Sequence, residues 1–493
     1  MSMDPRSPCL IGVARHTWHP ADVPEGAPEP LDMWEEMARA AALDAGVPDA
    51  LRALQSIDVV YSQSWQYDDP PTRLAERLGA KARRRGYSGI GGSVPQVLVA
   101  GVAREVMAGD IDLALVVGAE ALATVRRLKK AGEKPQWSHK PAERRPFPMD
   151  LEFHPSEISH SVFEAFLTFA LFDNARRAHV GRTLDEHSAR LGRLLAPLTE
   201  VAAGSPHAWF PLARPAAEIV TPTADNRMVA YPYTKLMTAI MDVDMAAGLL
   251  LASADKADAL GVPEEKRVYL RGWGYAEDPA HVADHAELWR SPAMAAASGA
   301  ALAGAGIGVD EVSHFDLYSC FASSVNFAQD ALGLAEDDSR GVTQTGGLPY
   351  HGGPGSNYMT HSIAAMAESL RADPGSYGLV SGVGMHMQKH VYGLWSTSAG
   401  SVTPDPLGRV PASPSLIVDD PEGPAIVATY SVQHGRDGGP ETALLVCDLP
   451  AGGRCYARLD GGPAALEEAE TRELIGRSVI LTPREGINLA RID

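Results

Sequence analysis

The feature that most constrains this chain of 493 residues is a glycine-rich unit that occurs twice. In the later copy, the turn Gly352-Gly353-Pro354-Gly355-Ser356 precedes a predicted helix over 357–371 and a predicted strand over 377–381. In the earlier copy, Gly91-Gly92-Ser93 precedes a predicted helix over 94–108 and a strand over 112–117. The spacing from the turn to the strand is 24 residues in both copies, Gly92 to Val116 and Gly355 to Leu379, so we expect a duplication.

An open turn that leads into a helix presents unpaired backbone N–H groups to whatever lies in front of it. Such a turn suits an oxyanion or a carbonyl oxygen. Further strands support the duplication, because 10–14 and 57–61 correspond to 268–273 and 314–318. Strands that alternate with helices predict an α/β fold with two βαβαβ-type halves around a largely parallel sheet. The two glycine turns are expected to meet at one cleft, beyond the carboxyl ends of the strands.

Changes in composition divide the chain into parts. A Ser-, Pro- and Gly-rich stretch separates the duplicated region from short alternating strands with glycine turns, which predict a small β-barrel of the oligonucleotide/oligosaccharide-binding type. The predicted boundaries are 1–125 and 228–265 for the first half, 126–227 for an inserted loop domain, 266–396 for the second half, 397–414 for a linker and 415–493 for the barrel.

Charge and cysteine content exclude several classes of protein. The formal net charge of -19 disfavours nucleic-acid and membrane-surface binding by the whole molecule. The four cysteines form neither a disulfide framework nor a zinc spacing, so we expect reduced thiols, no metal and a cytoplasmic location. Neither a signal peptide nor a membrane span is expected.

Three segments together resemble the thiolase superfamily, over roughly residues 5–400. They are Asp316-Leu317-Tyr318-Ser319-Cys320-Phe321, the block from Gly346-Gly347 to Gly355, and Gly382-Val383-Gly384. The chain is most similar to sterol-carrier-protein-type thiolases and actinobacterial thiolase-like proteins. The resemblance implies a layered α-β-α-β-α fold, coenzyme A or an acyl-CoA ester as substrate or ligand with no covalently bound cofactor, and a homodimer.

The catalytic positions of thiolases carry other residues here. The nucleophilic cysteine position falls at Gly92, and the Gly-His-Pro motif reads Gly352-Gly353-Pro354. The second cysteine position falls near Ser381 or Gly382. Because thiolases need a thiolate to carry the acyl group, thiolysis through a cysteinyl thioester is not expected.

The candidate catalytic residues are Tyr318, His351 and Tyr350. A phenol can donate a hydrogen bond or act as an acid, and the alternative is that Tyr318 fills a shortened pocket. His351 could be a base or a solvent-facing or capping histidine. The candidate substrate-binding residues are Gly92, Ser93, Gly353 and Gly382, with Ser93 favoured as a helix cap over a nucleophile.

The segment 126–145 holds eight Lys or Arg residues and two Glu. It lies where thiolases elaborate the loop domain, so the resemblance implies contacts to the phosphates of coenzyme A from Arg126, Arg127, Lys129 and Lys130. A solvated loop or a subunit contact is the alternative.

Three functions follow. The first is a thiolase-superfamily protein that acts on acyl-CoA, acyltransferase-like, in lipid or steroid metabolism. The second is a retro-aldol-type acyl-CoA lyase that uses Tyr318 and needs no cysteine. The third is a non-catalytic acyl-CoA or lipid binder, or a scaffold, with a protein partner at the barrel. The sequence leaves these alternatives open.

Overall fold

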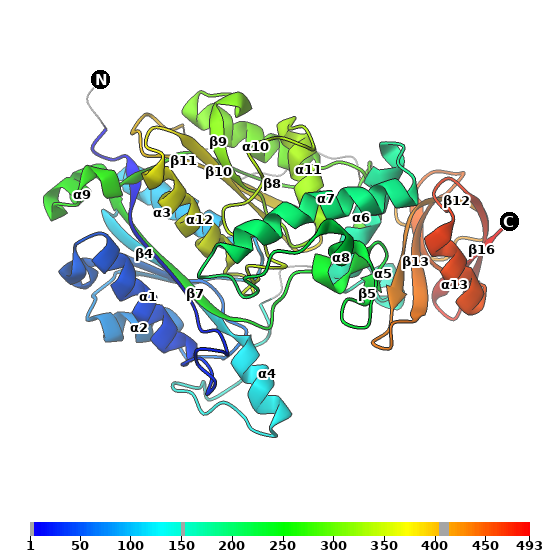
Figure 1. Cartoon of the computed structure of the whole chain (residues 1–493), viewed down its shortest axis with the longest axis horizontal. Coiled ribbons are helices and arrows are strands. Elements are labelled where there is room, and N and C mark those ends of the chain that lie inside the picture. Colours follow the sequence, from blue (N-terminus) through cyan, green and yellow to red (C-terminus); the bar gives the residue numbers. More distant parts are fainter. Residues whose placement is uncertain (1–3, 149–152, 404–413) are drawn as a thin grey trace.

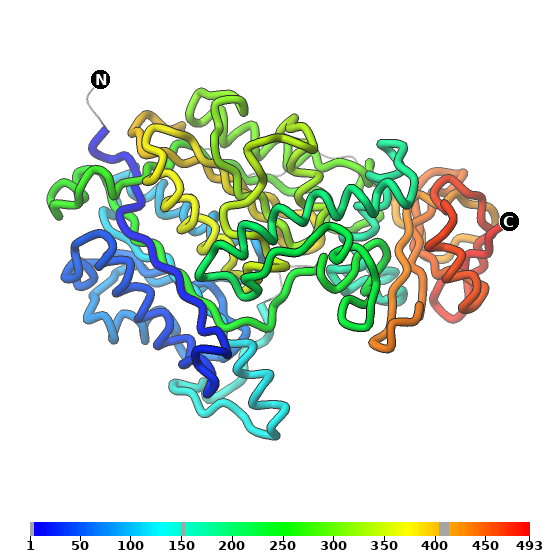
Figure 2. Tube along the Cα trace, in the orientation of Figure 1, coloured from blue at the N-terminus to red at the C-terminus, as the bar shows by residue number. Residues whose placement is uncertain are grey.

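The computed structural model describes residues 4–148, 153–403 and 414–493 (Figure 1). The greater part of the predicted linker 397–414 lies outside the described residues. Figure 2 shows the duplicated region as the larger body, with a compact module that contains the C-terminus at one end of the long axis.

A nine-stranded sheet forms the centre of the duplicated region, in the order β3-β2-β4-β7-β1-β8-β11-β10-β9. The first half supplies β1 (Pro8–Thr17), β2 (Ser56–Val59), β3 (Arg84–Tyr87), β4 (Leu113–Ala121) and β7 (Asp244–Ser253). The second half supplies β8 (Val268–Glu277), β9 (Val312–Asp316), β10 (Tyr377–Gly384) and β11 (Lys389–Ser396).

The strand order confirms the duplication. Reading outward from the centre, β1, β7, β4 and β2 correspond to β8, β11, β10 and β9, with the same alternation of directions. The two halves join through a short antiparallel pairing of β1 with β8, between which the pseudo-twofold axis passes.

The expected largely parallel sheet is wrong. Only the pairs β2–β3, β2–β4 and β9–β10 are parallel, and the other pairs of this sheet are antiparallel. An apolar run shows that a strand is buried but not which way it points, so the direction of β7 could not be inferred from its sequence.

Two helices lie in the middle layer, α3 (Val94–Ala108) and α12 (Tyr358–Ala372), one after each glycine turn. Each contacts strands of both halves, α3 on β4 and β11 and α12 on β7 and β10. The outer faces are covered by α1 (Pro30–Asp44), with α2 (Pro70–Leu78), and by α10 (Pro292–Ala305), with α11 (Ala322–Leu332). This is the layered α-β-α-β-α arrangement that the resemblance implies.

The outer helix α10 shows how local sequence sets an element. Its Ser291 side chain accepts a hydrogen bond from the Met294 amide at 2.9 Å, and Gly306 ends the helix with a φ of 71°. A serine cap and a left-handed glycine are the favoured start and stop of a helix. Small residues on α10 let its backbone approach β8 closely, since a Cβ on Gly272 would lie 2.0 Å from the Ala301 carbonyl oxygen.

The chain between β4 and β7 leaves the sheet as an insertion. Its elements are α4 (Leu122–Lys130), α5 (Pro155–Ser159), α6 (Ala165–His179), α7 (Leu184–Ala203), α8 (Ala216–Val220), β5 (Met228–Ala230) and β6 (Tyr233–Thr234).

The C-terminal module is a closed barrel. Its strands β12 (Gly423–His434), β13 (Pro440–Asp448), β14 (Arg454–Leu459), β15 (Ser478–Arg484) and β16 (Ile487–Ile492) pair in the ring β12-β13-β14-β16-β15-β12. The pair β14–β16 is parallel, and α13 (Gly462–Thr471) lies between β14 and β15 in sequence. A five-stranded barrel of this kind is OB-like, as the sequence predicted.

The barrel packs on the insertion rather than standing free. The Thr429 hydroxyl donates to the Leu171 carbonyl at 2.5 Å, and the Asn174 amide donates to the Tyr430 carbonyl at 2.8 Å. Through α6 the barrel is therefore attached to the duplicated region.

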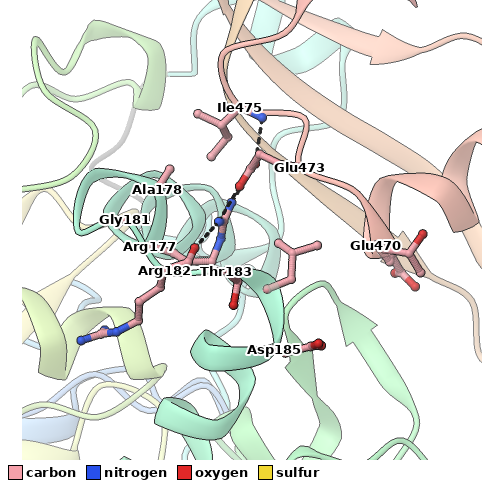
Figure 3. Close-up of a pocket in the computed structure, with 11 residues that line it drawn as sticks. Arg177, Ala178, Gly181, Arg182, Thr183, Asp185, Glu470, Glu473 and Ile475 are labelled. Carbon is pink, nitrogen blue, oxygen red and sulfur yellow. Dashed lines mark hydrogen bonds and ion pairs between the residues drawn. The ribbon is translucent and has the colours of Figure 1, made fainter.

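A pocket of about 850 Å³ separates the turn after α6 from α13 and the chain that follows it (Figure 3). Arg177 crosses it to form an ion pair with Glu473 and donates to the Arg182 carbonyl at 2.8 Å. Both cations and carboxylates line this pocket, and no residue of either glycine turn does. We therefore interpret it as a gap at the interface between the insertion and the barrel.

Candidate functional site

The two glycine turns meet, and each packs on the strand end of the other half. A Cβ atom on Gly92 would lie 2.1 Å from the Tyr318 hydroxyl oxygen and 2.4 Å from the Val383 carbonyl oxygen. Reciprocally, a Cβ on Gly355 would lie 2.5 Å from a carboxylate oxygen of Glu120. Together with the hydrogen bond of 3.0 Å from the Gly91 amide to the Ser356 hydroxyl, these contacts confirm that the two turns meet, and they explain why glycine occupies both turns.

Tyr318 fills the space beside Gly92. Its side chain is 6% exposed, and its amide donates to the Ser381 hydroxyl at 2.9 Å. Ser381 therefore supports the backbone of Tyr318 at the place where the resemblance implies a second cysteine. Burial raises the pKa of the Tyr318 phenol well above its ordinary value, so the group is a neutral hydrogen-bond donor.

A buried carboxylate holds the neighbouring turn in place. Asp316, at the end of β9, accepts hydrogen bonds from the amides of Gln344 and Thr345 at 2.9 and 3.0 Å. The Tyr358 hydroxyl, at the start of α12, donates to the same carboxylate at 3.1 Å. The Tyr358 ring packs edge-on against Tyr318, with ring centres 5.6 Å apart. Asp316 thus positions the ring that supports Tyr318.

His351 lies inside the protein, which excludes the solvent-facing alternative. It is fully buried, and neither ring nitrogen makes a hydrogen bond of standard geometry with the described residues. Burial, together with the charge of Arg15 and the neighbouring His207, lowers the pKa of His351 to about 3. Its ring centre is 5.4 Å from that of His361, whose pKa is also lowered well below its ordinary value by burial. A neutral imidazole of such low pKa is a poor general base.

The cysteines offer no thiolate at this cleft. All four are free and buried, and Cys320 lies in the segment from Asp316 to Phe321 at the end of β9, the strand-end motif. Burial raises the pKa of the Cys320 thiol to about 12, and its sulfur lies 3.7 Å from the Ser324 hydroxyl. Cys320 is therefore a protonated core residue.

The remaining glycine candidates allow close packing. A Cβ on Gly382 would lie 2.1 Å from the Met359 sulfur, and one on Gly353 would lie 3.2 Å from a Leu348 methyl carbon. Ser93 precedes α3 at the capping position, but its side chain makes no capping hydrogen bond, so the expectation that it caps the helix is wrong. Its hydroxyl instead lies close to Gly384, since a Cβ there would be 2.9 Å away.

Tyr350 opens onto a cavity of about 690 Å³ between the insertion and the later glycine turn. The side chain is 1% exposed, and its hydroxyl has no hydrogen-bond partner among the described residues. Fifteen residues line the cavity: Phe210, Arg214, Ala217, Glu218, Thr221, Thr223, Asp225, Asn226, Lys235, Leu236, Thr238, Ala239, Ile240, Pro349 and Tyr350.

The inner wall of this cavity adjoins the strand-end motif. The Ala239 amide donates to the Cys320 carbonyl at 3.1 Å, and the Ile240 amide donates to the Leu348 carbonyl at 3.3 Å. The Ile240 carbonyl accepts from the Gly353 amide at 2.8 Å. No sequence pattern pointed to this wall, because irregular chain between β6 and β7 forms it.

The four proposed phosphate contacts lie on α4 or at its end. Arg126 forms an ion pair with Asp242, and Arg127 donates to the Glu25 carbonyl. Lys129 and Lys130 are exposed. None of the four lines the cavity beside Tyr350, and their contact with coenzyme A stays a prediction.

Within the described ranges, no group of three or more His, Cys, Asp or Glu side chains could hold a metal ion. None of the described helices combines the length and the apolar character that crossing a membrane requires.

Comparison with known proteins gives structural matches. No family model matches the sequence, and no curated protein sequence does. The chain is similar over the whole of both chains to a monomeric SCP2-thiolase-like protein type 1 from Mycobacterium smegmatis, with 31% identity and a TM-score of 0.84.

Two further structures share the fold over 80% of this chain. An Ltp2-ChsH2(DUF35) aldolase is 15% identical with a TM-score of 0.59, over 98% of its chain. The dimeric peroxisomal thiolase of Saccharomyces cerevisiae is 14% identical with a TM-score of 0.56, over 99% of its chain. By its full-length similarity to the Mycobacterium protein, the chain belongs to the SCP2-thiolase-like branch of the thiolase superfamily.

Proposed function

We propose that the protein binds an acyl-CoA ester without forming a cysteinyl thioester. The observation that carries this proposal is the occupation of the space beside Gly92 by the Tyr318 hydroxyl. A nucleophilic side chain at position 92 has no room there, and the thiol in the neighbouring motif, Cys320, is protonated. What the site retains is the Tyr318 phenol as a hydrogen-bond donor, because the Gly91 and Gly353 amides already donate to the Ser356 hydroxyl and the Ile240 carbonyl.

The cavity beside Tyr350 supports a ligand of mixed character. Lys235 can meet phosphate oxygens, whereas Arg214 is already paired with Glu218, which lines the cavity together with Asp225. Phe210, Leu236 and Ile240 offer apolar surface. The Tyr350 hydroxyl is buried in the cavity wall without a partner among the described residues, and a small rotation of its ring would let it donate to an amide or thioester carbonyl. Because the cavity lies against the strand-end motif, the acyl end of such a ligand would extend toward Tyr318.

The binder is favoured over an acyltransferase because the candidate acid–base groups are poorly matched to proton transfer near neutral pH. Tyr318 and Tyr350 are neutral phenols with pKa values raised by burial. His351 is a neutral imidazole with a pKa of about 3. Efficient general acids and bases have pKa values near the working pH.

A retro-aldol-type lyase is the second candidate. It is favoured by the Tyr318 phenol, a hydrogen-bond donor beside Gly92 and Val383 that could act on a substrate β-hydroxyl once its ring leaves the space it fills. A solved structure of the same fold is described as an aldolase. Such a reaction needs no cysteine.

Calorimetry with coenzyme A and with short, long, branched and steroid acyl-CoA esters tests the proposal. We expect saturable binding of at least one ester. Tyr350→Phe should weaken binding about fivefold, because one hydrogen bond is lost. Absence of binding to every ester by the folded protein would leave the scaffold alternative.

Tyr318→Phe then separates the two candidates. Loss of turnover with retained binding supports the lyase. Equal binding and no turnover by either protein supports the binder. We also propose a role in lipid or steroid metabolism and a cytoplasmic location. The identity of the ester that binds would test the metabolic role.

The barrel and the assembly belong to this proposal too. In the described residues the barrel packs on α6 of its own chain, so a protein partner would have to contact its remaining surface. The similar Mycobacterium protein is described as monomeric and the yeast thiolase as dimeric. At 31% identity over the full length, the former is the better guide, and we propose a monomer in place of the homodimer.

A further inference from the structure

A second pocket, of about 610 Å³, lies in the first half. Its floor is the chain that follows β2, and its wall is the later part of the basic segment. The lining residues are Tyr61, Gln63, Ser64, Trp65, Gln66, Lys140, Pro141, Ala142, Arg144, Arg145 and Phe147. None of them lines the cavity beside Tyr350.

The position of this pocket is one where α/β sheets bind ligands. It lies beyond the carboxyl end of β2, which is parallel to its neighbours β3 and β4. Ligands of open α/β sheets bind in crevices outside the carboxyl ends of parallel strands. Tyr61 lies two residues beyond the end of β2, as Tyr318 lies two residues beyond the end of β9, so Tyr61 is the counterpart of Tyr318 in the other half. The pocket thus lies at the first-half position equivalent to that of Tyr318.

The wall is tied to the floor at one point. The Arg145 amide donates to the Gln66 side-chain oxygen at 3.2 Å, and the Gln66 side-chain nitrogen donates to the Arg145 carbonyl at 3.0 Å. The Arg145 guanidinium donates to the Asp68 carbonyl. This double bridge holds the segment over the chain after β2 and keeps the pocket open beside it.

The lining is cationic in an acidic protein. Lys140, Arg144 and Arg145 line the pocket and no carboxylate does, although the chain has 62 acidic and 43 basic residues. Glu120 lies behind the floor, where the Ser64 amide donates to it at 3.0 Å. Burial raises the pKa of Glu120 to about 7, which weakens its negative charge near neutral pH. The pocket therefore favours an anion with more than one charge.

Aromatic rings provide the other half of the lining. Trp65 is fixed by its ring N–H, which donates to the Ser138 carbonyl at 2.9 Å, and by Trp137 at 5.7 Å between ring centres. Phe147 packs edge-on against Tyr61 at 5.9 Å and keeps 48% of its surface exposed. Fixed and partly exposed rings beside cations suit a flat heterocycle attached to phosphates.

We propose that this pocket binds a purine nucleoside phosphate, with the base against Trp65 and Phe147 and the phosphates on Lys140, Arg144 and Arg145. Gln63 carries an exposed amide that can hydrogen-bond the edge of the base, whereas the Gln66 amide is held by Arg145. The site does not depend on the acyl-CoA proposal. The nucleotide could be free or could be the nucleotide end of coenzyme A.

Calorimetry on the full chain tests this site, with ADP as the probe and adenosine, pyrophosphate and pantetheine as comparisons. We expect saturable ADP binding, with adenosine and pyrophosphate each at least about tenfold weaker, because each lacks one of the two recognised parts. Pyrophosphate that binds as tightly as ADP would overturn the nucleoside part of the proposal. No saturable ADP binding by the folded protein would overturn all of it.

Matched variants locate the site. Lys140→Ala and Arg144→Ala should each weaken ADP binding about tenfold by removing a phosphate contact. Lys134→Ala removes an exposed lysine of the same segment that does not line the pocket, and should leave ADP binding unchanged. Equal ADP affinity in all three variants and the unaltered protein would contradict the site.

The same variants distinguish the source of the nucleotide. If Arg144→Ala weakens ADP and coenzyme A by equal factors, the pocket holds the nucleotide end of coenzyme A. If only ADP is weakened, the pocket holds a free nucleotide. Both results support the site, and acyl-CoA binding measured on Tyr350→Phe reports separately on the other cavity.

Discussion

The space that a side chain at position 92 would need is occupied by the Tyr318 hydroxyl. The Val383 carbonyl closes the other side of this volume, at 2.4 Å from where a Cβ on Gly92 would lie. Because one of the two neighbours is backbone, movement of the Tyr318 ring alone cannot make room.

We therefore expect Gly92→Ala to lower the free energy of unfolding by about 1–3 kcal/mol through overpacking. Gly101→Ala, within α3, is the matched control, since its nearest neighbour would be the Arg84 guanidinium at 3.8 Å. In that control the free energy of unfolding should rise by about 0.5–1 kcal/mol, because alanine makes the unfolded chain less flexible. Urea unfolding measures both, and a Gly92→Ala protein as stable as the unaltered one would show that the turn can yield.

Buried neutral histidines make stability depend on pH. The pKa of His351 is about 3 and that of His207 about 4 in the folded protein, both lowered by burial and by Arg15. The Arg15 guanidinium is paired with Glu368, which opposes part of that effect. In the unfolded chain each imidazole takes a proton near its ordinary value of 6.5.

Since the unfolded state binds more protons below pH 6.5, stability should fall as the pH falls toward the folded pKa values. Each such histidine contributes a loss of about 1 kcal/mol between pH 6.5 and pH 5.5. His351→Gln should reduce this slope by one histidine's share, measured by urea unfolding at several pH values. His179→Gln, at an exposed position at the end of α6, is the control for the substitution itself. An identical slope for His351→Gln would mean that His351 is protonated in the fold.

At the scale of elements, α6 is the helix to which the barrel is attached. Asn174 is fully buried in it, and its amide is the partner of the Tyr430 carbonyl in β12. The neighbouring Thr429 hydroxyl bonds the backbone of the same helix. Side-chain hydrogen bonds to backbone thus orient the barrel on the insertion.

Asn174→Ala should lower the free energy of unfolding by about 1–3 kcal/mol, because it leaves a buried carbonyl without its donor. Chemical denaturation measures the change, and Gln136→Ala, which truncates an exposed amide, should change stability by less than about 0.5 kcal/mol. If the two variants proved equally stable, the Tyr430 carbonyl would have to find another donor.

At the scale of the whole molecule, the edge strand β3 affects assembly. It carries Arg84 and Arg85, of which Arg84 is paired with Asp58 and Glu105 at 3.4 and 3.1 Å. Arg85 is exposed. A second copy that paired with this edge would bring like charges together, which disfavours edge-to-edge association.

We expect light scattering to give the mass of one chain, 52.4 kDa, at low and moderate salt. A mass twice as large would support the homodimer that the thiolase resemblance implies. A dimer that forms only at high salt would show that the arginines, rather than the shape of the edge, keep the chains apart.

The duplication, the missing catalytic cysteines and the OB-like barrel could all be predicted from the amino-acid sequence alone. Spacing, residue identity and the alternation of short strands are properties of local sequence, so they can be read without coordinates. They also placed Tyr318 and Tyr350 in the candidate site. Strands β3, β11 and β16 were not predicted. In β3, Arg84 and Arg85 break the apolar pattern of a buried strand.

Which side chains pack against one another could be learned only from the tertiary structure. That Tyr318 fills the volume beside Gly92, and that His351 is enclosed rather than exposed, depends on packing between segments far apart in the chain. The same holds for the basic segment, which folds so that Lys140 and Arg144 line a pocket while Lys129 and Lys130 do not. Periodicity predicts which face of an element is buried, but it carries no information about what lies against that face.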